Sequence, residues 1–178
     1  ALPLLTYTLK MSLMRTVIIG LIVSAAVLTC GCYETTLSLG SAADAKVDAA
    51  YCGDWLLGGD SSAKPSTLII RDFDGHQYYV ELSDNSSPDK PDRMSGFIVK
   101  IKSADFAQLT TLDKKAAASH LILRVGIKDG KLSLRQLDKN FFDGVTTDAA
   151  LHQKLEENID NPKMYEGEEQ LATRNEEK

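Results

Sequence analysis

The three cysteines carry the most reactive side chains of the sequence, and two of them are close together. Cys30 and Cys32 are separated by one glycine at the end of an apolar run, and Cys52 lies further along the chain. Three thiols are too few for a disulfide framework. The Cys-Gly-Cys pair could be a redox pair, a metal site or part of a processing signal, so its surroundings must discriminate between these functions.

The residues before this pair have the order of a secretory signal peptide. Arg15 supplies a positive charge, and residues 17–28 form an apolar segment followed by small or polar residues. Signal peptides have an apolar segment of about 7–15 residues, whereas a membrane-spanning helix needs about 20. We therefore expect a signal peptide over residues 1–31. Its first 10 or 13 residues precede two candidate start methionines and could lie upstream of the true start.

The junction at Gly31-Cys32 resembles the lipobox of bacterial lipoproteins. In that family a small residue precedes a cysteine, which is acylated and becomes the N-terminus after cleavage. Thr29 and Cys30 depart from the aliphatic and small residues usual before the cysteine. The resemblance implies lipid attachment at Cys32, with Cys30 as the alternative attachment site. A third interpretation is a signal peptide followed by ordinary cysteines.

The same resemblance implies a location and a first partner. A lipidated cysteine would hold the protein at a membrane of the bacterial cell envelope, and Tyr33 after the cysteine, in place of an aspartate, favours the outer membrane. Residues 32–50 are rich in small and polar side chains, which predicts a flexible tether between the lipid and a folded domain. The side of the membrane stays open.

The other candidates for catalysis or metal binding lack supporting neighbours. Cys52 stands alone and is most simply a small buried hydrophobe. The three histidines, His76, His120 and His152, show no metal-ligand spacing. No nucleophile-elbow, P-loop or dinucleotide-binding motif is present. We therefore expect no catalytic residue, no cofactor and no metal, and a protein that is not an enzyme.

Composition limits the class of partner. The 178 residues are 43% hydrophobic and 25% charged, which is typical of one soluble globular domain. The formal net charge is −5, and two of the basic residues fall within residues 1–31, where there is no acid. Nucleic-acid binding needs clustered Lys and Arg, so we expect no nucleic-acid partner.

Two stretches predict β-hairpins, because each places Asp-Gly between alternating apolar residues. In the first, a two-residue turn at Asp74-Gly75 would set Ile69 opposite Val80 and place Tyr78 on the same face of the sheet. In the second, a turn at Asp129-Gly130 gives a face of six apolar residues, with Arg124, Ser133 and Arg135 on the other face. That apolar face contains Leu121, Leu123, Val125, Ile127, Leu132 and Leu134.

Further strands and one helix complete the predicted domain over residues 51–175. We expect eight strands, near 54–57, 67–73, 76–82, 96–102, 105–111, 120–128, 131–138 and 169–174. An amphipathic helix over residues 146–159 precedes the last strand, with Leu151, Leu155 and Ile159 on one face. Closure into a barrel would remove the exposed edges of such a meander.

Gly53-Asp54-Trp55 on the first barrel strand resembles the Gly-x-Trp motif of lipocalins. The helix before the last strand is also similar to the lipocalin order of elements, and the combination is similar to small bacterial envelope lipoproteins with no known activity. The resemblance implies that Trp55 closes one end of the barrel with Gly53 and an arginine of a late strand. Arg135 and Arg174 are the candidates, and we take Arg135 for the motif.

Two functions follow, from different classes. A hollow barrel lined by Ile69, Tyr78, Val80, Val99 and Leu123 would bind a small apolar ligand, or the domain would bind another envelope component. If side chains fill the barrel, the alternative is a structural or assembly lipoprotein whose partners dock on surface loops such as residues 83–93.

Overall fold

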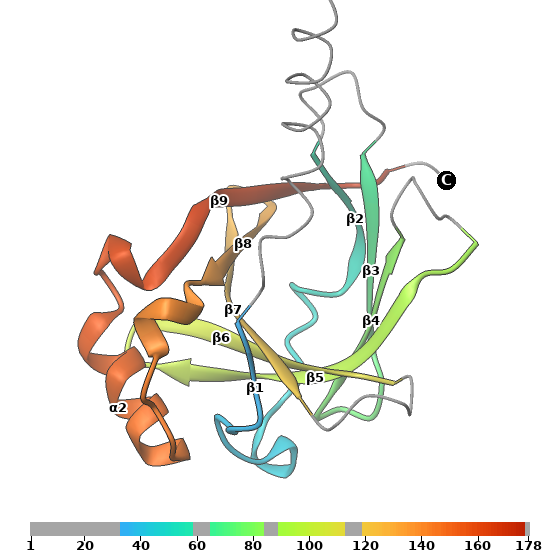
Figure 1. The fold of residues 1–178 in the computed structure, drawn as a ribbon. Helices are drawn as coiled ribbons and strands as arrows, with labels where there is room; N and C mark the ends of the chain where they lie inside the picture. Colours follow the sequence, from blue (N-terminus) through green and yellow to red (C-terminus); the bar gives the residue numbers. More distant parts are fainter. Residues whose placement is uncertain (1–32, 59–64, 84–88, 113–118, 177–178) are drawn as a thin grey trace, which may run out of the picture. The chain divides into compact units, whose positions relative to one another are not determined.

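The computed structural model describes residues 33–58, 65–83, 89–112 and 119–176 (Figure 1). The expected signal peptide, Cys30 and Cys32 lie outside these residues, as do residues 84–88 of the loop 83–93. The described residues belong to one compact unit. Its barrel strands are β2 (Gly53–Leu57), β3 (Ser66–Asp72), β4 (Tyr78–Ser83), β5 (Asp92–Ile101), β6 (Ala104–Thr111), β7 (His120–Lys128), β8 (Lys131–Leu137) and β9 (Tyr165–Arg174).

These eight strands form a closed antiparallel barrel. Each of β2 to β8 pairs with the strand that follows it in the chain, and β9 also pairs with β2. The α-helix, α2 (Asp148–Asn158), lies between β8 and β9. The predicted fold class, a mainly β meander closing into a barrel with one helix before the last strand, is therefore confirmed.

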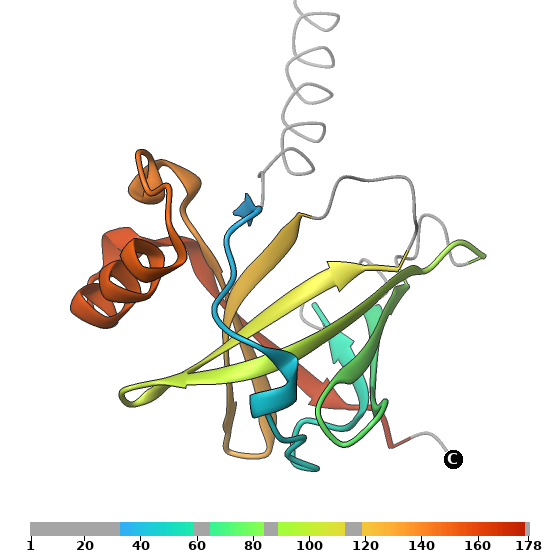
Figure 2. The ribbon, with the colours of Figure 1, turned by 90° about the horizontal axis from the view of Figure 1, so that it is seen from below.

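Strand β7 has two partners on one of its sides. Leu123 to Lys128 pair with β8, while His120 and Leu121 pair with the two-residue strand β1 (Glu34–Thr35). Strand β1 thus occupies the position that β8 leaves as it diverges from β7. The connection that follows β1 crosses the outer wall of the barrel (Figure 2).

The barrel interior is an apolar cluster, because alternate residues of every strand point inward. The second predicted hairpin contributes as expected: Leu123, Val125, Leu132 and Leu134 lie in this cluster, while Arg124 and Arg135 take the other face. The buried members of the interior cluster are Tyr51, Trp55, Leu68, Ile70, Tyr78, Val80, Ala107, Leu109, Val125, Leu132 and Ala172.

A second apolar cluster covers the outer wall of β5, β6 and β7. Leu151 and Leu155 of α2 and Met164 are fully buried there against Phe106 and Ile122. Strand β6 therefore has buried residues on both of its faces. This outer cluster fixes α2 to the barrel, and Figure 2 shows the helix outside the sheet.

Residues 33–50, expected from the sequence to be a tether, pack against the barrel: their first part belongs to this outer layer, and Val47 packs against the interior cluster. Tyr33 and Leu39 are buried, and the Leu39 N–H donates to Gln108 Oε1 at 2.7 Å. The Ser38 N–H donates to Asp148 Oδ1 at 2.9 Å, which links the segment to the first turn of α2.

The register of the first hairpin differs from the prediction by one residue. Ile70 lies opposite Val80, and Ile69 lies opposite Glu81. The Asp74 carboxylate accepts hydrogen bonds from the His76 and Gln77 N–H groups at 2.9 and 2.7 Å, which favours a wider turn with Gly75 at φ +82°. A shift of one residue moves every side chain of a strand to the other face.

The second hairpin has the predicted turn. Asp129 and Gly130 both have positive φ, at 51° and 73°, and Lys128 pairs with Lys131. This is the two-residue turn in which Asp-Gly is favoured.

Helix α2 has the expected signals at both ends. Thr147 caps it, with its Oγ1 accepting from the Ala150 N–H at 3.2 Å. The helix ends before Pro162, which begins a short 3-10 turn. Because an isolated helix of 11 residues is marginal in water, its stability depends on the outer cluster.

Candidate functional site

The two ends of the barrel differ, and the end that contains Trp55 is closed. Trp55 is fully buried, and its Nε1–H donates to the Tyr51 carbonyl at 3.0 Å. Residues 45–52 pass beneath it, with Ala45 and Tyr51 buried. This end is therefore filled by side chains.

The arginine that stacks on Trp55 is Arg174 of β9, not Arg135. Its guanidinium carbon lies 4.4 Å from the indole centroid, within the range of a cation–π interaction. Its Nη1 and Nη2 donate to the carbonyls of Cys52 and Ala50, each at 3.1 Å. Arg174 takes this role because β9, and not β8, is the neighbour of β2, with Trp55 opposite Arg174.

Gly53 is required by this arrangement for two reasons. Its φ of +153° is accessible almost only to glycine. A Cβ atom at this position would also lie 2.6 Å from Arg174 Nη1. The predicted motif of Gly53 and Trp55 therefore lies together at one end of the barrel, with Arg174 as its third member.

Two tyrosines form a polar network beside Trp55. The Tyr51 hydroxyl donates to Asp105 Oδ2 at 2.8 Å, and the Asp48 N–H donates to Tyr78 Oη at 2.7 Å. The two rings meet edge to face at 6.3 Å. Burial raises the pKa of Tyr51 above the usual tyrosine range, and the hydrogen bond to Asp105 raises it further. Both hydroxyls therefore stay neutral at physiological pH.

Cys52 lies next to this network and is half-buried. Burial raises the pKa of its thiol, and a protonated thiol is a poor nucleophile. The structure thus gives Cys52 no activating partner among the described residues.

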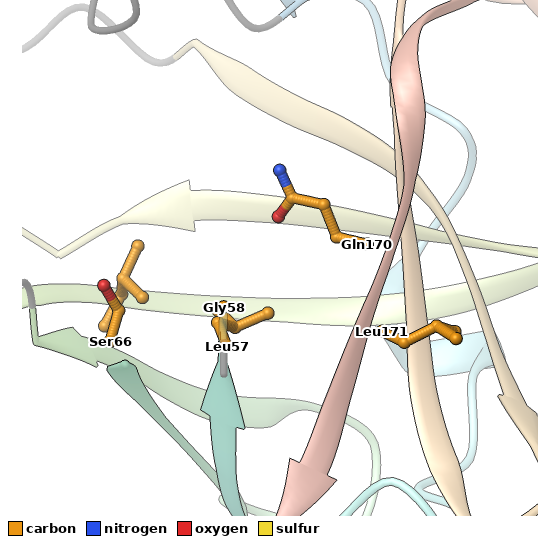
Figure 3. A pocket seen from close by; sticks show the side chains of 6 residues that line it. Leu57, Gly58, Ser66, Gln170 and Leu171 are labelled. Atoms are coloured by element: carbon orange, nitrogen blue, oxygen red, sulfur yellow. The ribbon is translucent and has the colours of Figure 1, made fainter. Parts of the chain in front are cut away.

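The opposite end of the barrel is a mouth lined by apolar side chains. A depression of about 480 Å³ is bordered there by Leu57, Gly58, Ser66, Leu82, Gln170 and Leu171. In Figure 3, Gln170 and Leu171 extend from opposite sides of β9. Leu57 and Leu82 belong to the partly buried margin of the interior cluster. We call this depression the barrel mouth.

The expected cavity-lining residues are distributed over three places. Tyr78 and Val80 are buried in the interior cluster, and Leu123 is at its margin. Ile69 lies opposite Asp54 and Glu81 on the outer face of the sheet. Val99 packs against the outer cluster beneath α2. Reasoning from the sequence missed the residues of the barrel mouth, because their roles depend on which strand ends meet across the closed sheet.

Arg135 lies on the outer wall, away from Trp55. Its guanidinium carbon is 4.1 Å from the ring centroid of Tyr165. Tyr165 is the first residue of β9, opposite Leu137.

The chemistry offered by the barrel mouth is burial of apolar surface with two neutral polar groups, Ser66 and Gln170, at its border. Within the described ranges, no group of three or more His, Cys, Asp or Glu side chains could hold a metal ion. Among the helices of the same residues, none has the length and apolar character needed to cross a membrane. No protein-family model, curated protein or solved structure matches the chain.

Proposed function

We propose that this protein is a non-enzymatic binding module whose barrel mouth takes a small apolar ligand. The observation that supports this best is the depression of about 480 Å³ at the mouth, where Leu57 and Leu82 are left partly exposed. Ligand pockets are concave and mostly apolar with few polar groups, and this description fits the mouth.

The ligand would be a short apolar group carrying one neutral polar atom. Each buried CH₂ contributes about 0.8 kcal/mol. Ser66 and Gln170 at the border offer a hydroxyl and an amide, so a hydroxyl or carbonyl on the ligand could be satisfied there. The Trp55 end is filled, so binding would be confined to the mouth.

The proposal includes a location. The lipobox-like Gly31-Cys32 supports attachment of a lipid to Cys32, with Cys30 as the alternative, and a place in the bacterial cell envelope. Anchoring there, at the outer membrane by preference, would hold the barrel close to apolar ligands or to another envelope protein.

The alternative function is a structural or assembly role, in which partners dock on the outside of the barrel. One observation favours it: the half of the interior next to Trp55 is packed with buried side chains, including Tyr51, Ile70 and Tyr78. A filled barrel of this kind is a rigid support.

A fluorescence titration separates the two functions. The neutral apolar fluorophore N-phenyl-1-naphthylamine should bind the wild-type chain with a rise in emission. Leu82→Gln at the mouth should weaken binding about tenfold, since that corresponds to 1.4 kcal/mol, about the contribution of a buried side chain.

The matched control is Ile127→Gln, because Ile127 is 39% exposed and lies beside the turn of the second hairpin. Its affinity should equal that of the wild type. Equal affinities in all three proteins, or no binding by the wild type, would contradict a ligand site at the mouth and favour the assembly role. Native mass spectrometry for co-purified lipid gives an independent measurement.

A further inference from the structure

Arg124 and Arg135 form a pair of cations on the outer wall of the barrel. They lie directly opposite one another on β7 and β8. Both guanidinium groups contact the ring of Tyr165, Arg135 at 4.1 Å and Arg124 at 5.7 Å from its centroid. Like charges directly opposite in a sheet are destabilising unless they are compensated, so their partners decide what the pair does.

Arg124 is compensated by neutral acceptors only. Its Nη1 donates to the Ile159 carbonyl at 3.1 Å and to Tyr165 Oη at 3.0 Å. Ile159 follows α2, so this guanidinium lies at the negative end of the helix dipole. Arg124 therefore fastens the C-terminus of α2 to the barrel wall.

Arg135 has no such acceptor among the described residues. Its Nε is buried and makes no hydrogen bond within the described residues, and its guanidinium group lies over the Tyr165 ring. The salt bridges of the described residues use Arg71, Arg93 and Lys102 instead. Because a buried N–H without an acceptor is destabilising, this guanidinium requires an explanation.

No acid of the described residues forms a salt bridge with either guanidinium group. Glu169 accepts a very short hydrogen bond from Ser133 Oγ. Asp160 is exposed and acts on Tyr165 only through its charge. The two guanidinium groups are thus left without a carboxylate partner in this part of the chain.

The strand opposite Arg135 is irregular. Leu134 pairs with Gln170, whereas Gln136 pairs with Glu166, so β9 carries extra residues at this point. Gly167 within this bulge has a φ of +67°. Bulges re-aim side chains and interrupt the ladder of backbone hydrogen bonds, and they are enriched beside functional sites. The bulge therefore lies opposite Arg135, and a Cβ atom added at Gly167 would meet no heavy atom within 4 Å.

We propose that Arg135, together with Arg124, binds a phosphate group on the outer wall of the barrel. A guanidinium matches the oxygens of phosphate with two parallel hydrogen bonds. Two adjacent cations attract the phosphate oxygens more strongly than one cation does. The phosphate would belong to a free phosphate compound or to a lipid headgroup, and both sources present the same chemistry.

Phosphorus NMR on the full chain in neutral detergent tests this site at constant ionic strength. One sample contains inorganic phosphate, and another contains glycerophosphoglycerol, a phosphodiester headgroup without acyl chains. The wild type should broaden the signal of at least one probe relative to micelles alone. Arg135→Gln should lower the affinity for that probe at least tenfold. Arg135→Lys keeps the charge but lacks the two parallel N–H donors of the guanidinium, so it should give an intermediate loss of affinity.

Arg71→Gln is the matched control, because Arg71 is an exposed arginine already paired with Asp54 at 2.6 Å. Arg71→Gln should change the affinity for either phosphate probe less than twofold. Broadening by inorganic phosphate alone identifies a free phosphate compound, and broadening by the headgroup alone identifies a lipid source. No broadening by either probe, or equal losses in Arg71→Gln and Arg135→Gln, would overturn the proposal.

The site is independent of the barrel mouth. Fluorophore binding by Arg135→Gln should equal that of the wild type, and the urea midpoint of Trp55 fluorescence verifies that the variant is folded. Failure of one site therefore leaves the other testable.

Discussion

At the scale of single residues, Gly53, Trp55 and Arg174 form a mutually dependent group. Trp55 supplies the buried surface, Arg174 covers it, and Gly53 leaves the space that the guanidinium occupies. Each member is explained by contacts with the other two, which accounts for their joint position at the closed end.

We predict that Gly53→Ala lowers the free energy of unfolding by about 2–4 kcal/mol, because the new Cβ would displace Arg174 and strain the backbone. Gly126→Ala is the control, since an added Cβ there has no heavy atom within 4 Å. Urea unfolding followed by the fluorescence of the single tryptophan measures both. In an Arg174→Ala background the cost of Gly53→Ala should fall; an unchanged cost would mean that the clash contributes nothing.

The tyrosines predict the alkaline limit of stability. Burial raises the pKa values of Tyr51, Tyr33, Tyr78 and Tyr165 in the folded state. The neutral phenols therefore stabilise the fold fully below about pH 10, the ordinary tyrosine pKa, and this contribution is lost as the pH rises above it.

Ultraviolet absorbance of tyrosinate checks this expectation. Ionisation of Tyr51 should coincide with unfolding of the chain, and Tyr51→Phe should show a shallower decline of stability between about pH 10 and 12. If all tyrosines of the wild type ionise near pH 10 without loss of Trp55 burial, the tyrosine contribution to alkaline unfolding is refuted.

At the scale of elements, the sequence predicted which segments are strands better than it predicted their register. Both hairpins contain Asp-Gly, but only Asp129-Gly130 adopts the two-residue turn. At Asp74, side-chain hydrogen bonds to two N–H groups widen the loop, and this competition is invisible in an alternation pattern. For that reason Ile69 lies on the outer face of the sheet, and the prediction that it lies on the face of Val80 is wrong.

The candidate site was predictable only in part for a similar reason. Gly53 and Trp55 are local in sequence and were recognised as a motif. The choice between Arg135 and Arg174 depends on the neighbour of β2 across the closed sheet, which is a long-range property. The barrel mouth is built from the ends of β2, β3 and β4 and from the middle of β9, and it has no local signature.

Helix α2 should depend on its buried face. Leu155→Ala would remove a fully buried side chain from the outer cluster and lower the free energy of unfolding by about 2–5 kcal/mol. Lys154→Ala at the neighbouring position should cost less than about 1 kcal/mol, because it removes only the cation–π contacts with Phe141 at 5.1 Å and Phe142 at 5.8 Å. If thermal unfolding gives the same loss of free energy for both variants, the apolar face of α2 contributes little to the stability of the fold.

At the scale of the whole molecule, the proposed anchor can be tested separately from the barrel. In a bacterial host fed an alkyne-tagged fatty acid, Cys32→Ser should abolish labelling, whereas Cys30→Ser should leave it unchanged. Cys52→Ser is the control, because Cys52 belongs to the folded domain. Label that persists in Cys32→Ser and disappears in Cys30→Ser would reverse the assignment.

The pairing of β2 with β9, which we call the seam because it closes the barrel, also determines the order in which parts of the sheet fold. All other junctions of the barrel join strands that are consecutive in the chain, whereas Arg174 contacts Cys52 across 122 positions. Closing so long a loop has a higher entropic cost than forming a hairpin, and the seam holds only three residue pairs. In a refolding experiment, the circular-dichroism signal of the sheet should therefore appear before the fluorescence change of Trp55, so that the tryptophan reports the moment at which an open sheet becomes a barrel.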